Sequence, residues 1–309
     1  MPCPRRPLLG WLPAALLVAC AERARLGGRV TIGAISHGEG AEVMAELEPF
    51  RTWLATEAGA LVQLDPAFNE NRAFERIRSR AWDLVVAPPG LAALAMGGSR
   101  YQPLFPLVGV ANRRSLFAVQ RASPITSLTD LAGRRVALGQ PGSVTGYYYP
   151  LFNLYGLTLA ELAFAPTPRA ALAWLVEGRF DAVALSQDEF DAHNGPPLRI
   201  LAADQHYVPP GLLLLTPDIE RTRGQQLQRL LADAPSVITR QVGYAPGADL
   251  PDYRHMFAVV ERVQAIFPQA PTTAVLRPAQ LFQIGGRTPA ARDSSRAGGL
   301  IPARSETMG

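Results

Sequence analysis

Lysine is missing from this chain of 309 residues, and all 30 basic residues are arginine. Six of the arginines lie in the first 20 and the last 25 residues, which leaves 24 basic and 24 acidic residues in 21–284. The central part of the chain is therefore formally neutral and lacks the basic stripe that a phosphate backbone requires, so we expect no nucleic-acid partner. Without a Gly-Lys pair, the glycine-rich stretches cannot form a P-loop.

Cysteine is almost missing as well, because Cys3 and Cys20 are the only two and both lie in the first 20 residues. No disulfide can therefore brace the fold. The apolar run from Leu8 to Val18 is too short to span a bilayer as an anchor. Since it follows two arginines and ends in small residues, it is typical of an export signal.

The end of this run, Leu-Val-Ala-Cys at 17–20, resembles a bacterial lipobox, in which the thiol is acylated and the chain is cut just before it. We expect 1–19 to be a lipoprotein signal peptide and 20–28 a tether, with the lipid on Cys20. The protein would then be periplasmic and anchored to a bacterial membrane through its lipid. The alternative is ordinary signal cleavage after Ala21.

Short apolar runs alternate with helical patterns along the rest of the chain, which predicts an α/β fold. Most of these runs are apolar on both faces, as the strands of buried parallel sheets are, so we expect mostly parallel sheets flanked by helices. We predict ten strands, at 29–36, 60–64, 82–87, 102–108, 115–120, 135–139, 162–165, 182–185, 199–202 and 211–215. Helices are predicted at 42–57, 169–176, 218–242 and 252–267.

Two segments, 107–120 and 208–215, look like crossings between two lobes, which together would form a hinge. We predict a first lobe built from 29–112 and 213–284, a second lobe built from 113–212, and a disordered tail at 285–309. The cleft between the two lobes is the natural place for a small-molecule site. We expect the protein to be a monomer.

The segment 128–150, Leu-Thr-Asp-Leu-Ala-Gly-Arg-Arg-Val-Ala-Leu-Gly-Gln-Pro-Gly-Ser-Val-Thr-Gly-Tyr-Tyr-Tyr-Pro, resembles the most recognisable part of one protein family. These are the phosphate-, phosphite- and phosphonate-binding proteins of bacterial ABC importers, a branch of the type II periplasmic binding proteins. Weaker similarity covers most of 29–270. The resemblance implies an exported solute-binding protein that captures a small anion between its lobes and delivers it to an ABC permease and ATPase.

Ser143, Val144, Thr145 and Gly146 follow a predicted strand and a Pro-Gly turn and open an apolar helix. Free backbone N–H groups and hydroxyls at such a position suit an oxyanion. The resemblance implies that Ser143, Val144 and Thr145 hold the phosphonyl oxygens of the ligand. The alternative is that Ser143 or Thr145 only caps the helix.

The resemblance also places Phe68, Pro89 and Asp188 at ligand-contacting positions of the family, although Asp188 could instead cap a helix. Gly211 stands where the family has a second carboxylate, which argues against an aminophosphonate. We therefore expect a plain oxyanion, or an anion with an apolar arm that faces Phe68 and Tyr147.

Arg169 starts a predicted helix, where a cation opposes the helix dipole, so we expect an anion near it. The alternative for Arg169 is a solvated position on the surface.

None of the four histidines, His37, His193, His206 and His255, lies in a recognised metal-ligand motif, and no nucleophile, base and orienting acid can be assembled. We expect no enzymatic activity, no metal and no cofactor. The alternative to import is a tethered sensing module that signals to a membrane receptor, kinase or cyclase.

Overall fold

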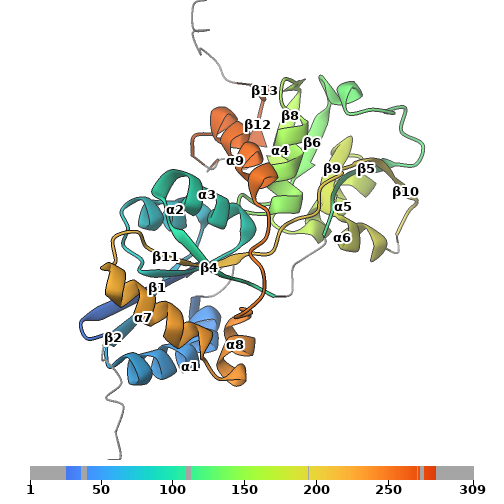
Figure 1. Ribbon diagram of the computed structural model, residues 1–309. Coiled ribbons are helices and arrows are strands. Elements are labelled where there is room, and N and C mark those ends of the chain that lie inside the picture. The colour runs from blue at the N-terminus through green and yellow to red at the C-terminus, as the bar shows by residue number, and fades with distance from the viewer. Residues whose placement is uncertain are drawn as a thin grey trace, which may run out of the picture.

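The computed structural model describes residues 26–35, 40–108, 113–193, 195–269, 271 and 275–282. These residues form two lobes, each built on a mixed β-sheet with helices packed against it (Figure 1). The predicted α/β class is confirmed, and all ten predicted strands are present within a few residues of their expected bounds. None of the described helices is both long and apolar enough to cross a membrane.

The sheet of the first lobe has the strand order β2-β1-β3-β11-β4. Its strands are β1 (Arg29–Ile35), β2 (Leu61–Ala67), β3 (Leu84–Ala87), β4 (Gln102–Pro106) and β11 (Leu212–Leu215). The helices of this lobe are α1 (Gly40–Ala58), α2 (Glu70–Arg78), α3 (Pro89–Ser99), α7 (Arg221–Ala232) and α8 (Ser236–Val242). The predicted helix 218–242 is two helices, because Pro235 lacks an N–H and starts a new helix rather than continuing the old one.

The sheet of the second lobe has the order β10-β5-β9-β6-β8-β12. Its strands are β5 (Ser115–Gln120), β6 (Arg135–Leu138), β8 (Glu161–Phe164), β9 (Ala182–Ser186), β10 (Leu198–Ala203) and β12 (Val275–Leu276), and a small separate sheet joins β7 (Thr158–Leu159) to β13 (Ala279–Gln280). Its helical segments are η1 (Thr129–Leu131), η2 (Val144–Tyr148), α4 (Tyr149–Asn153), α5 (Pro168–Val176) and α6 (Gln187–Asp191).

Both sheets are mixed, whereas the sequence predicted mostly parallel ones. Part of each sheet does pair in parallel, β1 with β2 and β3 in one sheet and β6 with β8 and β9 in the other. The strands next to the crossings run the other way, since β11 is antiparallel to β3 and β4, and β5 is antiparallel to β9 and β10. Apolar composition on both faces reveals burial but not strand direction, which explains the difference.

The C-terminal part of the chain does not stay in the first lobe, although 213–284 was expected there. Helix α9 (Arg254–Ile266) packs on α3 of the first lobe and on α4 of the second, and β12 then pairs with β8. The chain thus passes between the lobes three times instead of two. Met256, Val259, Val260 and Val263, one apolar stripe of α9, belong to a buried cluster that is continuous across both lobes.

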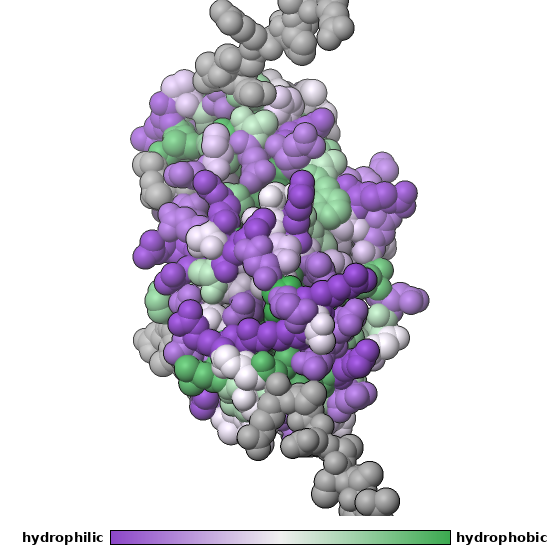
Figure 2. Space-filling view, turned by 60° about the vertical axis from the view of Figure 1, so that its left-hand side comes forward, coloured by the Kyte–Doolittle hydropathy of each residue, from purple (hydrophilic) through white to green (hydrophobic). Residues whose placement is uncertain are grey.

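Several predictions lie outside the described residues. They include the signal peptide and Cys20, most of the tether, residues 109–112 of the first crossing, and the tail beyond residue 282. His37 also lies outside the described residues. On the face of the molecule that Figure 2 shows, hydrophilic side chains predominate and apolar ones are scattered among them.

Candidate functional site

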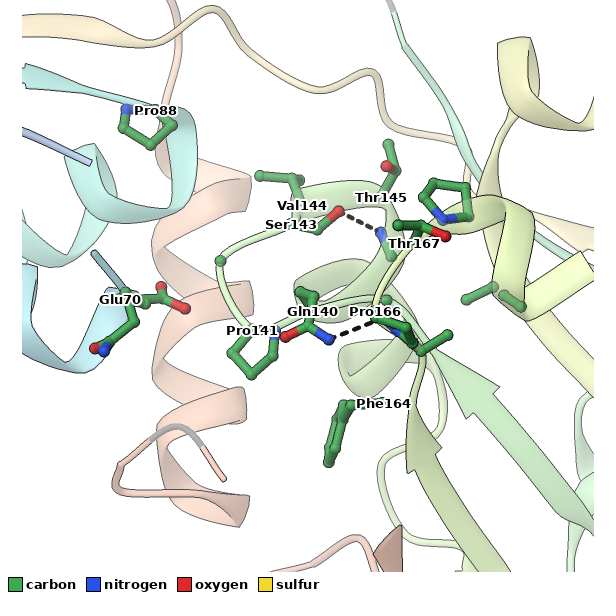
Figure 3. Close-up of a pocket in the computed structure, with 18 of the residues that line it drawn as sticks. Glu70, Pro88, Gln140, Pro141, Ser143, Val144, Thr145, Phe164, Pro166 and Thr167 are labelled. Atoms are coloured by element: carbon green, nitrogen blue, oxygen red, sulfur yellow. Dashed lines mark hydrogen bonds between the residues drawn. The ribbon is translucent and has the colours of Figure 1, made fainter. Parts of the chain in front are cut away.

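A cavity of about 970 Å³ lies between the two lobes. The first lobe contributes 68–71, which follow β2, and Pro88 and Pro89, which follow β3. The second lobe contributes 139–146 after β6 and 164–168 at the end of β8 and beyond it. The carboxyl ends of central strands thus meet at the cavity, as they do at ligand sites of many α/β proteins. Figure 3 shows Glu70 and Pro88 on one side, facing the segment with Pro141 and Ser143 on the other.

The second-lobe wall begins with a very close approach between Gly139 and Gly146. The N–H of Gly139 donates to the carbonyl of Gly146 at 2.8 Å. A Cβ atom on Gly139 would lie 3.1 Å from the Cα of Gly146, and a Cβ on Gly146 would lie 3.0 Å from the Cα of Gly139. Two glycines at these positions therefore let the end of β6 press directly against η2.

Hydrogen-bond donors gather at the start of η2. Ser143 is the N-cap, since its Oγ accepts from the N–H of Gly146 at 3.0 Å, and its own hydroxyl proton is still able to donate. The N–H groups of Val144 and Thr145 have no hydrogen-bond acceptor among the residues that the structure describes. The segment can thus offer two N–H groups and two hydroxyls to one oxyanion.

Six of the nine expected ligand-contacting residues line the cavity, and they come from both lobes. They are Ser143, Val144, Thr145, Gly146, Phe68 and Pro89. Phe68 is 61% exposed, so its ring is available to a ligand.

Tyr147 does not line the cavity. Its side chain is buried, and its ring packs edge-on against the ring of Tyr148. The centroids of the Tyr147 and Phe164 rings are 5.8 Å apart. An apolar arm of the ligand would meet Phe164, which lines the cavity, instead of Tyr147. Burial also raises the pKa of the Tyr147 phenol, so this group stays neutral.

Asp188 lies outside the cavity, and its neighbour Glu189 lines it. The Asp188 carboxylate lies 3.3 Å from Nε of Arg113 and is largely exposed. Asp188 does not cap α6 either, because Ser186 and Glu189 form a capping box there. Successive side chains of a helix point about 100° apart. Glu189 can therefore face the cavity while Asp188, one residue earlier, points away from it.

Arg169 is exposed and is not one of the lining residues. Arg169 belongs to α5, which Thr167 caps. Its neighbour Pro168 lines the cavity, and Arg169 does not. The basic residue that does line the cavity is Arg113, two residues before β5. Sequence reasoning missed it because it lies in a crossing segment between two predicted strands, where no motif marks it as facing the cavity.

Glu70 is a second residue that the sequence did not reveal. It is only 5% exposed, and its Oε1 accepts a hydrogen bond from the hydroxyl of Tyr148 in the other lobe. Its Oε2 has no partner among the described residues. Burial raises the pKa of this carboxyl from 4.5 to about 7, although the hydrogen bond from Tyr148 acts in the opposite direction. An Asn followed by an acidic residue is an ordinary helix start, so the sequence did not indicate that Glu70 is buried at the cavity.

Comparison with known proteins gives matches over much of the chain. Residues 32–243 match the family of periplasmic substrate-binding proteins of phosphonate ABC transporters. The phosphate-import protein PhnD of Mycolicibacterium smegmatis is 24% identical over 172 residues, which cover 54% of each chain. The chain thus matches about half the length of this curated relative.

Solved structures share the fold at low sequence identity. XAC2383 from Xanthomonas citri, bound to chloride ion, has a TM-score of 0.62 and 21% identity, over 76% of this chain and 98% of that one. PhnD1 from Prochlorococcus marinus, in complex with methylphosphonate, has a TM-score of 0.51 and 17% identity over the same shares of the two chains. The architecture is that of type II periplasmic binding proteins. Since the family match spans well over half of the sequence, the chain belongs to the periplasmic substrate-binding proteins of phosphonate ABC transporters, which bind solutes and are not enzymes.

Proposed function

We propose that the protein captures a small phosphorus oxyanion, of the phosphonate, phosphite or phosphate type, in the interlobe cavity and delivers it to an ABC permease and ATPase. The observation that carries this proposal is the group of donors at the start of η2. The N–H groups of Val144 and Thr145 have no acceptor among the described residues, and both residues line the cavity beside the hydroxyl of Ser143. An oxyanion satisfies several such donors at once.

The relatives support this class of ligand. One is a phosphate-import protein and another was solved with methylphosphonate. Arg113 at the cavity wall is paired with the exposed carboxylate of Asp188. Since Glu70 and Glu189 line the same cavity, the selection of an anion rests on the η2 donors and not on the net charge of the wall. The wall also carries Phe68, Phe164 and several prolines, which suit an apolar substituent on the phosphorus atom.

The size of the cavity favours binding by lobe closure. A volume of about 970 Å³ is at the upper end of ordinary ligand pockets and exceeds what a bare tetrahedral anion fills. The anion would first bind the η2 donors of the second lobe, and Phe68 of the first lobe would then close over it. The ligand shifts the lobes toward the closed arrangement only as far as it binds that arrangement more tightly.

We expect phosphorus oxyanions to raise the thermal unfolding midpoint of the protein. The panel consists of phosphate, phosphite, methylphosphonate, phenylphosphonate, 2-aminoethylphosphonate and sulfate. At about one hundred times its dissociation constant, a ligand adds about 2.7 kcal/mol, which is several degrees for a chain of this size. Sulfate is the matched control for shape. A midpoint that moves with none of the phosphorus compounds would refute the proposed ligand class.

We further propose that Cys20 carries a lipid that holds the protein at a bacterial membrane. The support is the sequence Leu-Val-Ala-Cys at 17–20 after an apolar run. We expect the wild-type protein to fractionate with membranes and to incorporate a labelled fatty acid in a bacterial host, and Cys20→Ser to lose both properties. Cys3→Ser is the control, because Cys3 precedes the apolar run and should be removed with the signal peptide. Equal labelling of Cys20→Ser and the wild type would exclude the anchor.

A further inference from the structure

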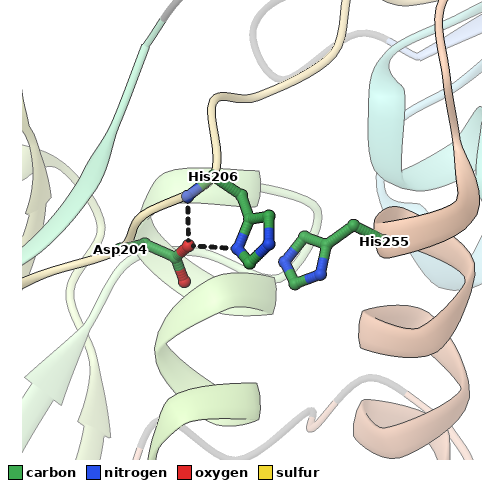
Figure 4. Close-up of side chains that lie close together, drawn as sticks. All are labelled: Asp204, His206 and His255. Carbon is green, nitrogen blue, oxygen red and sulfur yellow. Dashed lines mark hydrogen bonds and ion pairs between the residues drawn. The ribbon is translucent and has the colours of Figure 1, made fainter.

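Three side chains with metal-binding atoms lie together outside the cavity. Asp204 follows β10, His206 comes two residues later, and His255 lies in the first turn of α9 (Figure 4). One potential ligand atom from each residue lies within 4.8 Å of those from the other two. The sequence predicted no metal site, because His255 is distant in the chain and only the third crossing brings it to the other two.

Asp204 lies within hydrogen-bond distance of His206. Its side chain is buried, and Oδ1 accepts from the backbone N–H of His206 at 2.8 Å and lies 3.0 Å from Nδ1 of the same residue. The other oxygen, Oδ2, accepts from the amide of Asn153 at 2.8 Å. The 3.0 Å between Oδ1 and Nδ1 is close to the separation of two ligand atoms on one metal ion, and an ion bound there would take the place of a proton on Nδ1.

His255 supplies a second imidazole with an unused ring nitrogen. Its ring stacks on that of His206, with centroids 3.4 Å apart and planes inclined by 15°. Its Nε2 is buried and has no hydrogen-bond partner in the described part of the chain. An unpartnered buried polar atom is unfavourable, so a group that binds this nitrogen would stabilise the fold.

We propose that Asp204, His206 and His255 form a binding site for a divalent transition metal ion of the zinc type. Two imidazoles and one carboxylate are ligands that zinc, cobalt and nickel accept, with water in the fourth position. Calcium and magnesium need six or more oxygen ligands, which this group does not offer. Ligand atoms around a tetrahedral zinc ion are about 3.3 Å apart, so the two rings must turn out of their stack. Half of the His206 side chain is exposed, which leaves it room to turn.

A metal ion at this site would join three parts of the molecule. Asp204 and His206 lie in the segment that returns to the first lobe, and His255 fixes α9. Asn153 and Tyr149, which contact Asp204 and His255, belong to α4, the direct continuation of η2. The ion would therefore fix the crossing segments behind the donors of the cavity. This inference does not depend on the identity of the anion.

The test is zinc and cobalt binding by the full chain, purified without a histidine tag and freed of metal with a chelator. Titration calorimetry measures zinc affinity, and the visible absorption of bound cobalt reports nitrogen ligands in a tetrahedral site. We expect one ion per chain and a raised thermal midpoint. His206→Gln, His255→Gln and Asp204→Asn should each weaken binding by at least about tenfold, since loss of a ligand costs no less than loss of an outer-shell partner.

His193→Gln is the matched control, because His193 is a partly exposed histidine in the loop after α6 and lies outside the three-residue group. It should bind zinc as the wild type does. Thermal midpoints of the metal-free variants show whether each is folded, and if one variant unfolds the other two decide the result. A wild-type chain that binds neither ion would overturn the proposal, and so would His206→Gln and His255→Gln variants that bind as tightly as the wild type.

Discussion

The double substitution Ser143→Ala, Thr145→Ala is expected to weaken binding of the phosphorus oxyanion by at least about a hundredfold. Each hydroxyl would donate to a charged oxygen, and hydrogen bonds to charged groups contribute about 1.5–3 kcal/mol each. Two of them correspond to a loss of two to four powers of ten in affinity, at about 1.4 kcal/mol per tenfold. Titration calorimetry with the ligand that raises the midpoint most measures the change.

The control for this experiment is Ser186→Ala. Ser186 caps α6 as Ser143 caps η2, and it is buried but does not line the cavity. Loss of either cap should reduce the free energy of unfolding by about 1 kcal/mol. Ser186→Ala therefore shows how much the loss of a helix cap, without the loss of a ligand contact, changes anion affinity. If both variants bind the anion equally well, the hydroxyls of Ser143 and Thr145 are caps and nothing more.

The elements of the fold were predictable because local patterns carry them. A short apolar run between turn residues specifies a buried strand wherever it pairs, and all ten predicted strands exist. Pairing direction and lobe membership depend on contacts between distant segments. The sequence from Met256 to Val263 predicts the apolar stripe of α9. It does not indicate that this stripe packs against both α3 and α4.

The same distinction applies to the candidate site. Ser143 to Gly146 are consecutive and follow one strand, so a single motif brought them together, and they do line one cavity. Glu70 and Arg113 reach the same cavity from different segments, and their places follow only from how the lobes meet. Asp204, His206 and His255 illustrate the point again, because the third crossing assembles them.

The second large effect is expected at Glu70, as a stability difference that depends on pH. The folded protein binds the Glu70 proton more tightly than the unfolded chain, since burial raises the pKa from 4.5 to about 7. Protonated Glu70 therefore makes its full contribution to the free energy of unfolding below pH 4.5, and this contribution is lost as the pH rises through 7. This pKa difference corresponds to about 3 kcal/mol in the free energy of unfolding, at about 1.4 kcal/mol per pKa unit.

Glu70→Gln removes the titration and keeps the shape of the protonated side chain. The variant should gain about 3 kcal/mol relative to the wild type between pH 4.5 and 8, because only the wild type loses stability there. Urea unfolding of both proteins at pH 5 and pH 8 measures most of this change. Groups that titrate in both proteins cancel in the comparison.

Glu75→Gln is the control on the same helix, because Glu75 is exposed and pairs only with the exposed Arg72. Its difference from the wild type should be small and the same at both pH values. The result for Glu70 also bears on the lobes, since Tyr148 of the second lobe contributes to its burial. A Glu70→Gln difference that is constant from pH 5 to pH 8 would mean that water reaches this carboxyl. In that case the two lobes do not hold Glu70 against Tyr148 in solution, and the cavity is more open than its walls indicate.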